Sequence, residues 1–206
     1  MDNKTLAQTF DQSILRPESI SNDEIKRVCE EAKTYGFRGV VVHPCNVSLV
    51  KELLNGSNVL TISVCDFPHG KGLIKSRAKD IKEILKLGAD EIDVVANYQY
   101  LIDDDYRNFK KDLKACAKEM EDKVLKIILE VDYLKDRHIK VAVEAICKVA
   151  NEENKKLIVK TKTGFAESRI LNQDALRVIK KTLEINNMYG KIQIKTSGGI
   201  KTREEA

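Results

Sequence analysis

A lysine lies inside one of the most apolar segments of the chain, where an ammonium ion is costly to bury. Residues 157–165 read Leu-Ile-Val-Lys-Thr-Lys-Thr-Gly-Phe, and this run of apolar and β-branched residues before a glycine predicts a buried strand. Because side chains alternate along a strand, Lys160 shares a face with Ile158. A buried lysine beside other cations loses its proton more easily, and a neutral amine can attack a carbonyl carbon. The alternative is a lysine at a strand end whose ammonium reaches water, and this segment alone does not choose between the two.

Two more ionisable residues follow the same pattern in other predicted strands. Asp93 lies between Ile92 and Val94, and Lys195 follows Ile194. At the carboxyl ends of parallel strands, lysines on consecutive strands are neighbours, and like charge favours the neutral amine that a Schiff base requires. An aspartate on the same face could transfer protons or order a water. The chemistry indicated is cleavage of a carbon–carbon bond through an iminium, with no metal and no other cofactor.

Glycines follow both lysine-bearing strands. Gly164 comes after the first, and Gly198 and Gly199 come after the second. Glycine turns leave backbone N–H groups open to an anion, most naturally a phosphate. Each turn is a weak signal by itself, but its place just beyond an inward lysine strengthens the interpretation. The three histidines lack the spacing of metal ligands, and His138, near a helix start, is expected to lie in solvent.

Strand and helix patterns alternate along the whole chain. A capping box at Ser21 and Glu24 opens the first long helix, and Gly36 ends it. Strand starts are spaced by about thirty residues, which predicts a parallel sheet. The six predicted strands are 39–43, 59–65, 91–95, 124–131, the segment around Lys160, and 191–196.

Two architectures fit this order, a doubly wound open sheet and a (β/α) barrel. An open sheet covered by helices on both faces would bury the charged strand residues in apolar packing. A barrel would gather them in one interior, where they can pair. These inward residues are Asp93, Lys126, Glu130, Lys160 and Lys195. We therefore predict a single domain over residues 1–206, a parallel (β/α) barrel of the TIM type.

Composition and charge exclude some classes of function. Of the 206 residues, 33% are charged, and the net charge of +4 is spread along the chain, which argues against a nucleic-acid surface and suits small anionic substrates. Five scattered cysteines without a C-x-x-C pair indicate reduced thiols. No apolar stretch has the length of a signal peptide core or a membrane span. We expect a cytoplasmic protein that binds neither nucleic acid nor membrane.

Seven segments, in their order and spacing, resemble deoxyribose-phosphate aldolase, the class I aldolase family of deoxynucleoside catabolism. They are 11–17, 39–44, 67–70, 88–95, 124–130, 159–165 and 194–200. The resemblance implies a cofactor-free, reversible cleavage of 2-deoxy-D-ribose 5-phosphate to D-glyceraldehyde 3-phosphate and acetaldehyde. The expected partners are therefore a phosphorylated sugar and a small aldehyde.

The resemblance also implies a role for each matching residue. Lys160 would form the Schiff base, Asp93 and Lys195 would donate and accept protons, and Lys126 would contact the substrate near the reacting carbons. The remaining substrate contacts, including those to the phosphate, would come from Thr163, Gly164, Gly198 and Gly199. No residue is implied as a metal ligand.

The sequence departs from the family at single positions, among them Lys162, His43, Val41 and Val131, and in its number of strands. Lys162 stands where the family usually has a small hydroxyl residue. The six predicted strands fall short of the family's eight, as though the last two βα units were missing, and an unclosed barrel exposes two strand edges. A truncated chain, an edge covered by a second subunit in a homodimer, and a shortened relative without activity all remain open.

Two other functions also stay open. One is a Schiff-base aldolase or dehydratase for a different phosphorylated carbonyl compound, which Lys162 and His43 would favour. The other is a non-catalytic, phosphate-binding relative, which the missing strands would favour.

Overall fold

The computed structural model describes residues 2–16, 21–166 and 173–198, which fall into two compact units. The first unit comprises Met1–Cys65 and Asp80–Asp93, and the second comprises Asp66–Lys79 and Val94–Ala206. Helix α4 (Ile74–Lys86) and strand β4 (Glu91–Val95) each contribute residues to both units. The single domain predicted from the sequence stays a prediction.

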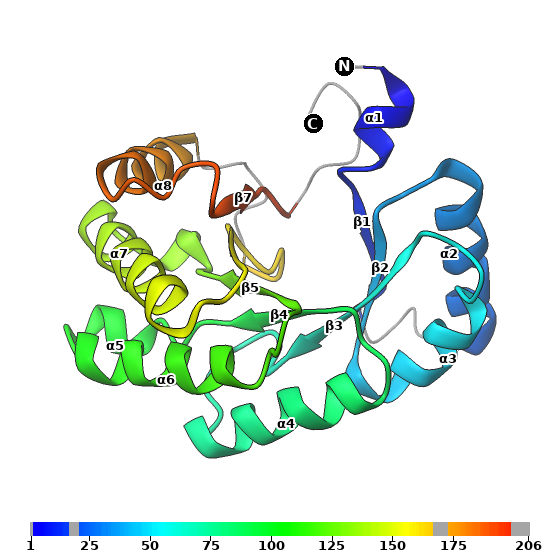
Figure 1. Ribbon diagram of the computed structural model, residues 1–206, viewed down its shortest axis with the longest axis horizontal. Helices are drawn as coiled ribbons and strands as arrows, with labels where there is room; N and C mark the ends of the chain where they lie inside the picture. The colour runs from blue at the N-terminus through cyan, green and yellow to red at the C-terminus, as the bar shows by residue number, and fades with distance from the viewer. Residues whose placement is uncertain (1, 17–20, 167–172, 199–206) are drawn as a thin grey trace. The chain divides into compact units, whose positions relative to one another are not determined.

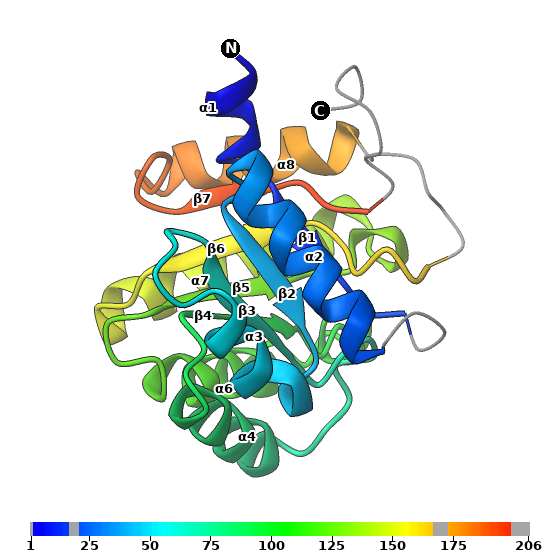
Figure 2. The same cartoon turned by 90° about the vertical axis from the view of Figure 1, so that its right-hand side faces the viewer.

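Three parallel strands build the first unit. β1 (Asp11–Ser13) pairs with β2 (Gly39–Val42), and β2 pairs with β3 (Leu60–Cys65). Helix α2 packs on β2, in front of which it lies in Figure 2, and α3 packs on β3. The helices and the 3₁₀ turn of this unit are α1 (Asn3–Ala7), α2 (Asn22–Tyr35), η2 (Pro44–Asn46) and α3 (Val47–Leu53).

The ends of α2 lie where the sequence predicts them. The Ser21 Oγ accepts a hydrogen bond from the Glu24 N–H at 3.1 Å, and Gly36 takes the left-handed conformation with φ 68°. The residues that α2 buries are Ile25, Val28, Cys29 and Ala32, a spacing of three and four that faces the sheet. The predicted helix is confirmed at both ends.

Three further parallel strands build the second unit. β5 (Val124–Ile128) pairs with β6 (Leu157–Lys160), and β6 pairs with β7 (Gln193–Lys195). Helix α7 packs between α6 and α8 and also contacts β6 (Figure 1). The helices and the 3₁₀ turn of this unit are α5 (Gln99–Ile102), α6 (Tyr106–Lys118), η3 (Val131–Tyr133), α7 (Asp136–Glu153) and α8 (Gln173–Ile185).

Strand β4 continues the same hydrogen-bonding pattern in each unit. Just before it, the Asp90 N–H donates to the Thr61 carbonyl at 2.7 Å, and just after it the Ala96 N–H donates to the Ile128 carbonyl at 2.9 Å. The strand order follows the chain from β1 to β7. The predicted alternation of strands and helices in a parallel sheet is confirmed.

The described residues contain seven strands, and the prediction of six was wrong. The additional strand is β1, which spans only Asp11–Ser13. Three polar residues are too short a segment for the alternation of apolar and polar side chains to be read. The described residues therefore supply seven strands, against the eight of a complete (β/α) barrel.

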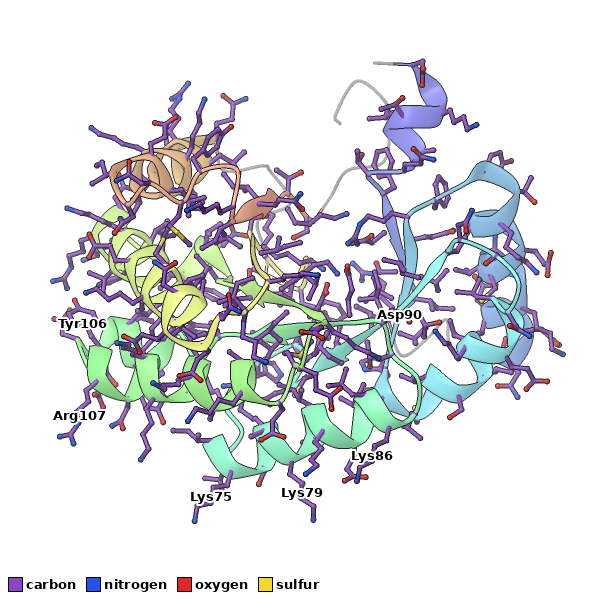
Figure 3. The ribbon with its side chains drawn as sticks, viewed as in Figure 1. Lys75, Lys79, Lys86, Asp90, Tyr106 and Arg107 are labelled. Carbon is purple, nitrogen blue, oxygen red and sulfur yellow. The ribbon has the colours of Figure 1, made fainter. Side chains whose placement is uncertain are left out.

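Charged side chains cover the outer sides of the helices. Figure 3 shows Lys75, Lys79 and Lys86 extending away from α4, and Arg107 extending away from the start of α6. Phe109 of α6 is buried, in keeping with an amphipathic helix on a sheet. Among the described residues, no helix combines the length and the apolar character needed to cross a membrane.

Candidate active site

Three lysines of the second unit lie on one face of its sheet. Lys160, the last residue of β6, is in register with Lys195, the last residue of β7, and with Ile128 of β5. Lys126 precedes Ile128 by two residues and therefore shares its face. Lys126 is completely buried, Lys160 is 8% exposed and Lys195 is half-buried. The alternation seen in the sequence thus places all three amines on one side of parallel strands.

Asp93 lies on β4, between the buried residues Ile92 and Val94, and is completely buried. It is the last residue of the first unit. Its burial agrees with an inward-facing carboxyl group, and its proposed part in proton transfer stays a prediction.

The chain leaves β5 earlier than the sequence predicts. β5 ends at Ile128, and Glu130 takes a left-handed conformation with φ 43° before the turn η3. The predicted strand over 124–131 was therefore three residues too long. The backbone continues to follow the end of β6, because the Leu129 N–H donates to the Lys160 carbonyl and the Val131 N–H to the Thr161 carbonyl, both at 3.0 Å.

Glu130 holds the turn that follows β6. Its Oε2 accepts hydrogen bonds from the Thr163 N–H at 3.3 Å and from the Thr163 hydroxyl. The Phe165 N–H in turn donates to the Thr163 Oγ1 at 3.1 Å. Burial raises the pKa of the Glu130 carboxyl, and the two bonds from Thr163 oppose that shift. Thr163, predicted to bind substrate, is thereby fixed in place by a residue from the segment that follows β5.

Ser197 joins the end of β7 to the end of β6. Its hydroxyl donates to the Lys162 carbonyl at 2.6 Å and accepts from the Lys162 N–H at 3.2 Å. The Ser197 N–H donates to the Thr161 Oγ1 at 3.0 Å. Sequence reasoning did not select Ser197, whose only signal is its place between the strand and the glycines.

Two predicted glycines meet at this junction. Gly164 has φ 81° and Gly198 has φ 87°, backbone conformations that residues with a Cβ rarely adopt. A Cβ added to Gly164 would lie 3.4 Å from the Gly198 Cα, so the two turns are in contact. Gly199, the third predicted glycine, lies outside the described residues.

Lys162 is buried beneath these turns. Its side chain is 1% exposed, and its Nζ lies 3.2 Å from the Asp132 Oδ2, which is also buried. The residue that departs from the family pattern thus forms an ion pair between the segment after β5 and the segment after β6.

A buried arginine anchors the loop after β3. The Arg77 Nη1 lies 2.6 Å from the Asp112 Oδ2 and donates to the Gly70 carbonyl at 3.2 Å. In the same loop, Phe67 makes an edge-to-face contact with Phe165, with ring centroids 5.1 Å apart. Neither contact was predicted, because both join residues that are distant in the sequence.

His138 is buried, and the prediction that it lies in solvent was wrong. The Lys135 N–H donates to its Nδ1 at 3.3 Å, so the ring folds back over the start of α7. Within the described residues, no group of three or more His, Cys, Asp or Glu side chains is placed to hold a metal ion.

An α/β fold with buried lysines at the carboxyl ends of parallel strands is typical of an aldolase. A sequence model of the DeoC/LacD family aldolases matches residues 5–206. Proteins named deoxyribose-phosphate aldolase from Treponema denticola and Dictyoglomus turgidum are each 36% identical to this chain. The alignments cover 98% and 100% of this chain and 88% and 89% of the relatives. The chain belongs to the DeoC/LacD aldolase family.

Solved structures agree with this assignment. A crystal structure of a Coccidioides immitis protein, 29% identical, gives a TM-score of 0.88 and covers all of this chain and 78% of the other. A protein described as QR15, an aldolase, is 30% identical with a TM-score of 0.83, covering 97% and 84% of the two chains. The tetrameric deoxyribose phosphate aldolase of Aeropyrum pernix, 23% identical with a TM-score of 0.80 and a coverage of 99% and 82%, shares the fold. The predicted (β/α) barrel fold class is confirmed.

Proposed function

We propose that this chain is a class I aldolase that reversibly cleaves 2-deoxy-D-ribose 5-phosphate to D-glyceraldehyde 3-phosphate and acetaldehyde. Family membership and relatives named deoxyribose-phosphate aldolase support the reaction and the substrate. The observation that carries the mechanism is the buried Lys160 at the end of β6, in register with Lys195 of β7 and on the face that also bears Lys126.

Lys160 is the amine that we assign to the Schiff base. Its neutral Nζ attacks C1 of the open-chain sugar to give a carbinolamine, which loses water to form an iminium. The iminium draws the electron pair of the C2–C3 bond toward nitrogen. This bond breaks as the C3 hydroxyl loses its proton, so glyceraldehyde 3-phosphate leaves and an enamine of acetaldehyde remains on Lys160. Protonation at C2 and hydrolysis then release acetaldehyde and restore the amine.

We assign the proton transfers to Asp93 and Lys195, and the contact near the reacting carbons to Lys126. Both Asp93 and Lys126 are completely buried, where ionisable groups are costly unless they are paired or used. Lys160 and Lys195 are in register on neighbouring strands, which supports a role of Lys195 in proton transfer. The phosphate is assigned to Gly164, Gly198 and Gly199, and a further substrate contact is assigned to Thr163.

Borohydride trapping tests the Schiff base directly. The protein is incubated with acetaldehyde, reduced, digested and analysed by mass spectrometry. We expect an ethyl group on the peptide that contains Lys160, and no comparable label on exposed lysines such as Lys156. The Lys160→Ala variant should lose both the label and the cleavage of 2-deoxyribose 5-phosphate. Equal labelling of Lys156 and Lys160, or unchanged cleavage by the variant, would contradict the assignment.

One observation favours a second candidate substrate. Lys162 places a buried cation beside the glycine turns, where the family usually has a small hydroxyl residue. A Schiff-base aldolase for another phosphorylated carbonyl compound would use the same Lys160. Measuring kcat/KM for a panel of sugar phosphates separates the two, since the proposed function requires 2-deoxyribose 5-phosphate to be the preferred substrate.

The proposal includes a cellular setting and an assembly. Five free cysteines, four of them buried, support a cytosolic protein, and the names of its relatives support a part in deoxynucleoside catabolism. A homodimer is the assembly that we propose. Light scattering coupled to size exclusion should give a mass of about twice 23.3 kDa, and a monomer mass would exclude the homodimer.

A further inference from the structure

A buried cation lies beneath the turns that we assign to the phosphate. The Lys162 side chain is 1% exposed, and its Nζ lies 3.2 Å from the Asp132 Oδ2. An isolated ammonium would be too costly at this burial, so Asp132 makes its charge tolerable and also fixes its position. Asp132 belongs to η3, directly after the segment in which Glu130 holds Thr163.

The stem of Lys162 packs against the Gly198 turn. A Cβ added to Gly198 would lie 2.9 Å from the Lys162 Cε and 3.0 Å from its Cγ. Cε is the carbon that carries the ammonium, so the charge is close behind this turn. The Lys162 backbone is bonded to the Ser197 hydroxyl in both directions, which fixes the turn relative to the lysine.

A charge held at a fixed point acts strongly on a second charge nearby. In the interior of a protein, where the effective dielectric constant is lower than in water, Coulomb interactions extend further and are screened less by salt. An anion at the turns of Gly164 and Gly198 would therefore be attracted by the Lys162 ammonium without touching it. A neutral hydroxyl residue at position 162 would supply no such attraction.

We infer that Lys162 is a specificity-determining residue, which selects phosphorylated substrates by placing a fixed positive charge behind the Gly164 and Gly198 turns. The inference rests on the proposed function, because the glycine turns are the assigned phosphate site. Asp132 is the positioning residue, since it holds the ammonium in place and at the same time reduces its attraction for a second anion.

Binding of inorganic phosphate tests the charge separately from catalysis. Isothermal titration at constant ionic strength would compare the wild type with Lys162→Met, which keeps the stem and removes the charge, and with Asp132→Asn. We expect Lys162→Met to weaken phosphate binding by about ten-fold or more. Asp132→Asn keeps an amide oxygen that can accept a hydrogen bond from the ammonium and removes a neighbouring anion, so the affinity of this variant should stay the same or increase. The matched control is Lys156→Met, an exposed lysine just before β6, which should change affinity by less than about two-fold.

The two variants separate charge from structure. If the ion pair is only a structural tie, Lys162→Met and Asp132→Asn should both weaken phosphate binding, and that result would overturn the inference. So would a change of less than about two-fold in Lys162→Met. The double variant Lys162→Met/Asp132→Leu leaves no unpaired charge and guards against misfolding of the single variant. Judged folded by circular dichroism, it should bind phosphate more weakly than the wild type, but no more weakly than Lys162→Met, because the Asp132 carboxylate is removed as well.

Kinetics give a second readout. The ratio of kcat/KM for 2-deoxyribose 5-phosphate to that for 2-deoxyribose should fall by about ten-fold in Lys162→Met, chiefly through KM for the phosphorylated sugar. An unchanged ratio would count against the inference. If the wild type cleaves neither sugar, the proposed function fails, while the phosphate titration still decides the role of Lys162.

Discussion

The contact between Gly198 and Lys162 makes a quantitative prediction about stability. In Gly198→Ala the new Cβ would lie 2.9 Å from the Lys162 Cε and 3.0 Å from its Cγ. The end of a lysine side chain usually moves aside at little cost, but here it is buried and paired with Asp132. We expect this overpacking to cost about 1–3 kcal/mol. The left-handed backbone at φ 87° should add about 1 kcal/mol.

Gly190 provides a matched control for the backbone term. It has φ 88°, and a Cβ at this position would meet nothing within 4 Å. Gly190→Ala should therefore show only the backbone cost of about 1 kcal/mol. The difference in unfolding free energy between the two alanine variants, measured by urea denaturation, gives the cost of the contacts of the new Cβ with Lys162 and with the Gly164 Cα.

A double-mutant cycle then tests the contact itself. Lys162→Ser removes both Cγ and Cε, so in that background Gly198→Ala should cost only its backbone term and the contact of the new Cβ with the Gly164 Cα at 3.3 Å. The coupling energy between the two sites should be about 1–3 kcal/mol. The reasoning is refuted if the two substitutions are additive within about 0.5 kcal/mol, or if Gly198→Ala costs no more than Gly190→Ala.

Three further predictions concern stability, each measured by chemical denaturation. Burial raises the pKa of Glu130 in the folded protein above the ordinary value of 4.5. The contribution of the protonated carboxyl to the free energy of unfolding is therefore present below the unfolded pKa and is lost as the pH rises through the folded pKa. The stability of Glu130→Gln relative to the wild type should thus increase as the pH rises above the unfolded pKa of about 4, and a flat difference would contradict this. Asp112→Ala removes the closer of the two carboxylates that pair with the buried Arg77 and should cost about 3–5 kcal/mol, against less than about 1 kcal/mol for the exposed Lys86→Ala. Ser21→Ala removes the cap of α2 and should cost about 1 kcal/mol, whereas Ser21→Asp, which keeps an oxygen acceptor, should cost almost nothing.

The sequence predicts those features of the site that depend on local periodicity. Alternation along the strands placed Lys126, Lys160 and Lys195 on one face, and the register of β5, β6 and β7 agrees. Glycines directly after strands marked the turns at Gly164 and Gly198, which the structure brings into contact. Such signals are carried by neighbouring residues and need no knowledge of the tertiary structure.

What the sequence does not predict depends on contacts between distant segments. Glu130 continues the alternating pattern of the predicted strand. In the structure β5 nevertheless ends before Glu130, because the backbone turns there while its N–H groups still bond to the end of β6. The ion pair of Lys162 and Asp132 joins residues that are thirty positions apart in the sequence. The hydrogen bonds of Lys162 with Ser197 join residues that are thirty-five positions apart. β1 is too short and too polar to show any period. Each of these features is decided by tertiary structure, which overrides local preference.

The contact between Phe67 and Phe165 offers an optical signal. The 206 residues contain no tryptophan, so a single tryptophan at position 165 would be the sole indole emitter. Phe165 is 42% exposed and meets the edge of Phe67 at a centroid distance of 5.1 Å. The emission of Phe165→Trp would therefore report how far the turn after β6 moves from the loop after β3. Stopped-flow fluorescence on such a variant could time any movement of that turn when phosphate binds, independently of any bond that the enzyme makes or breaks.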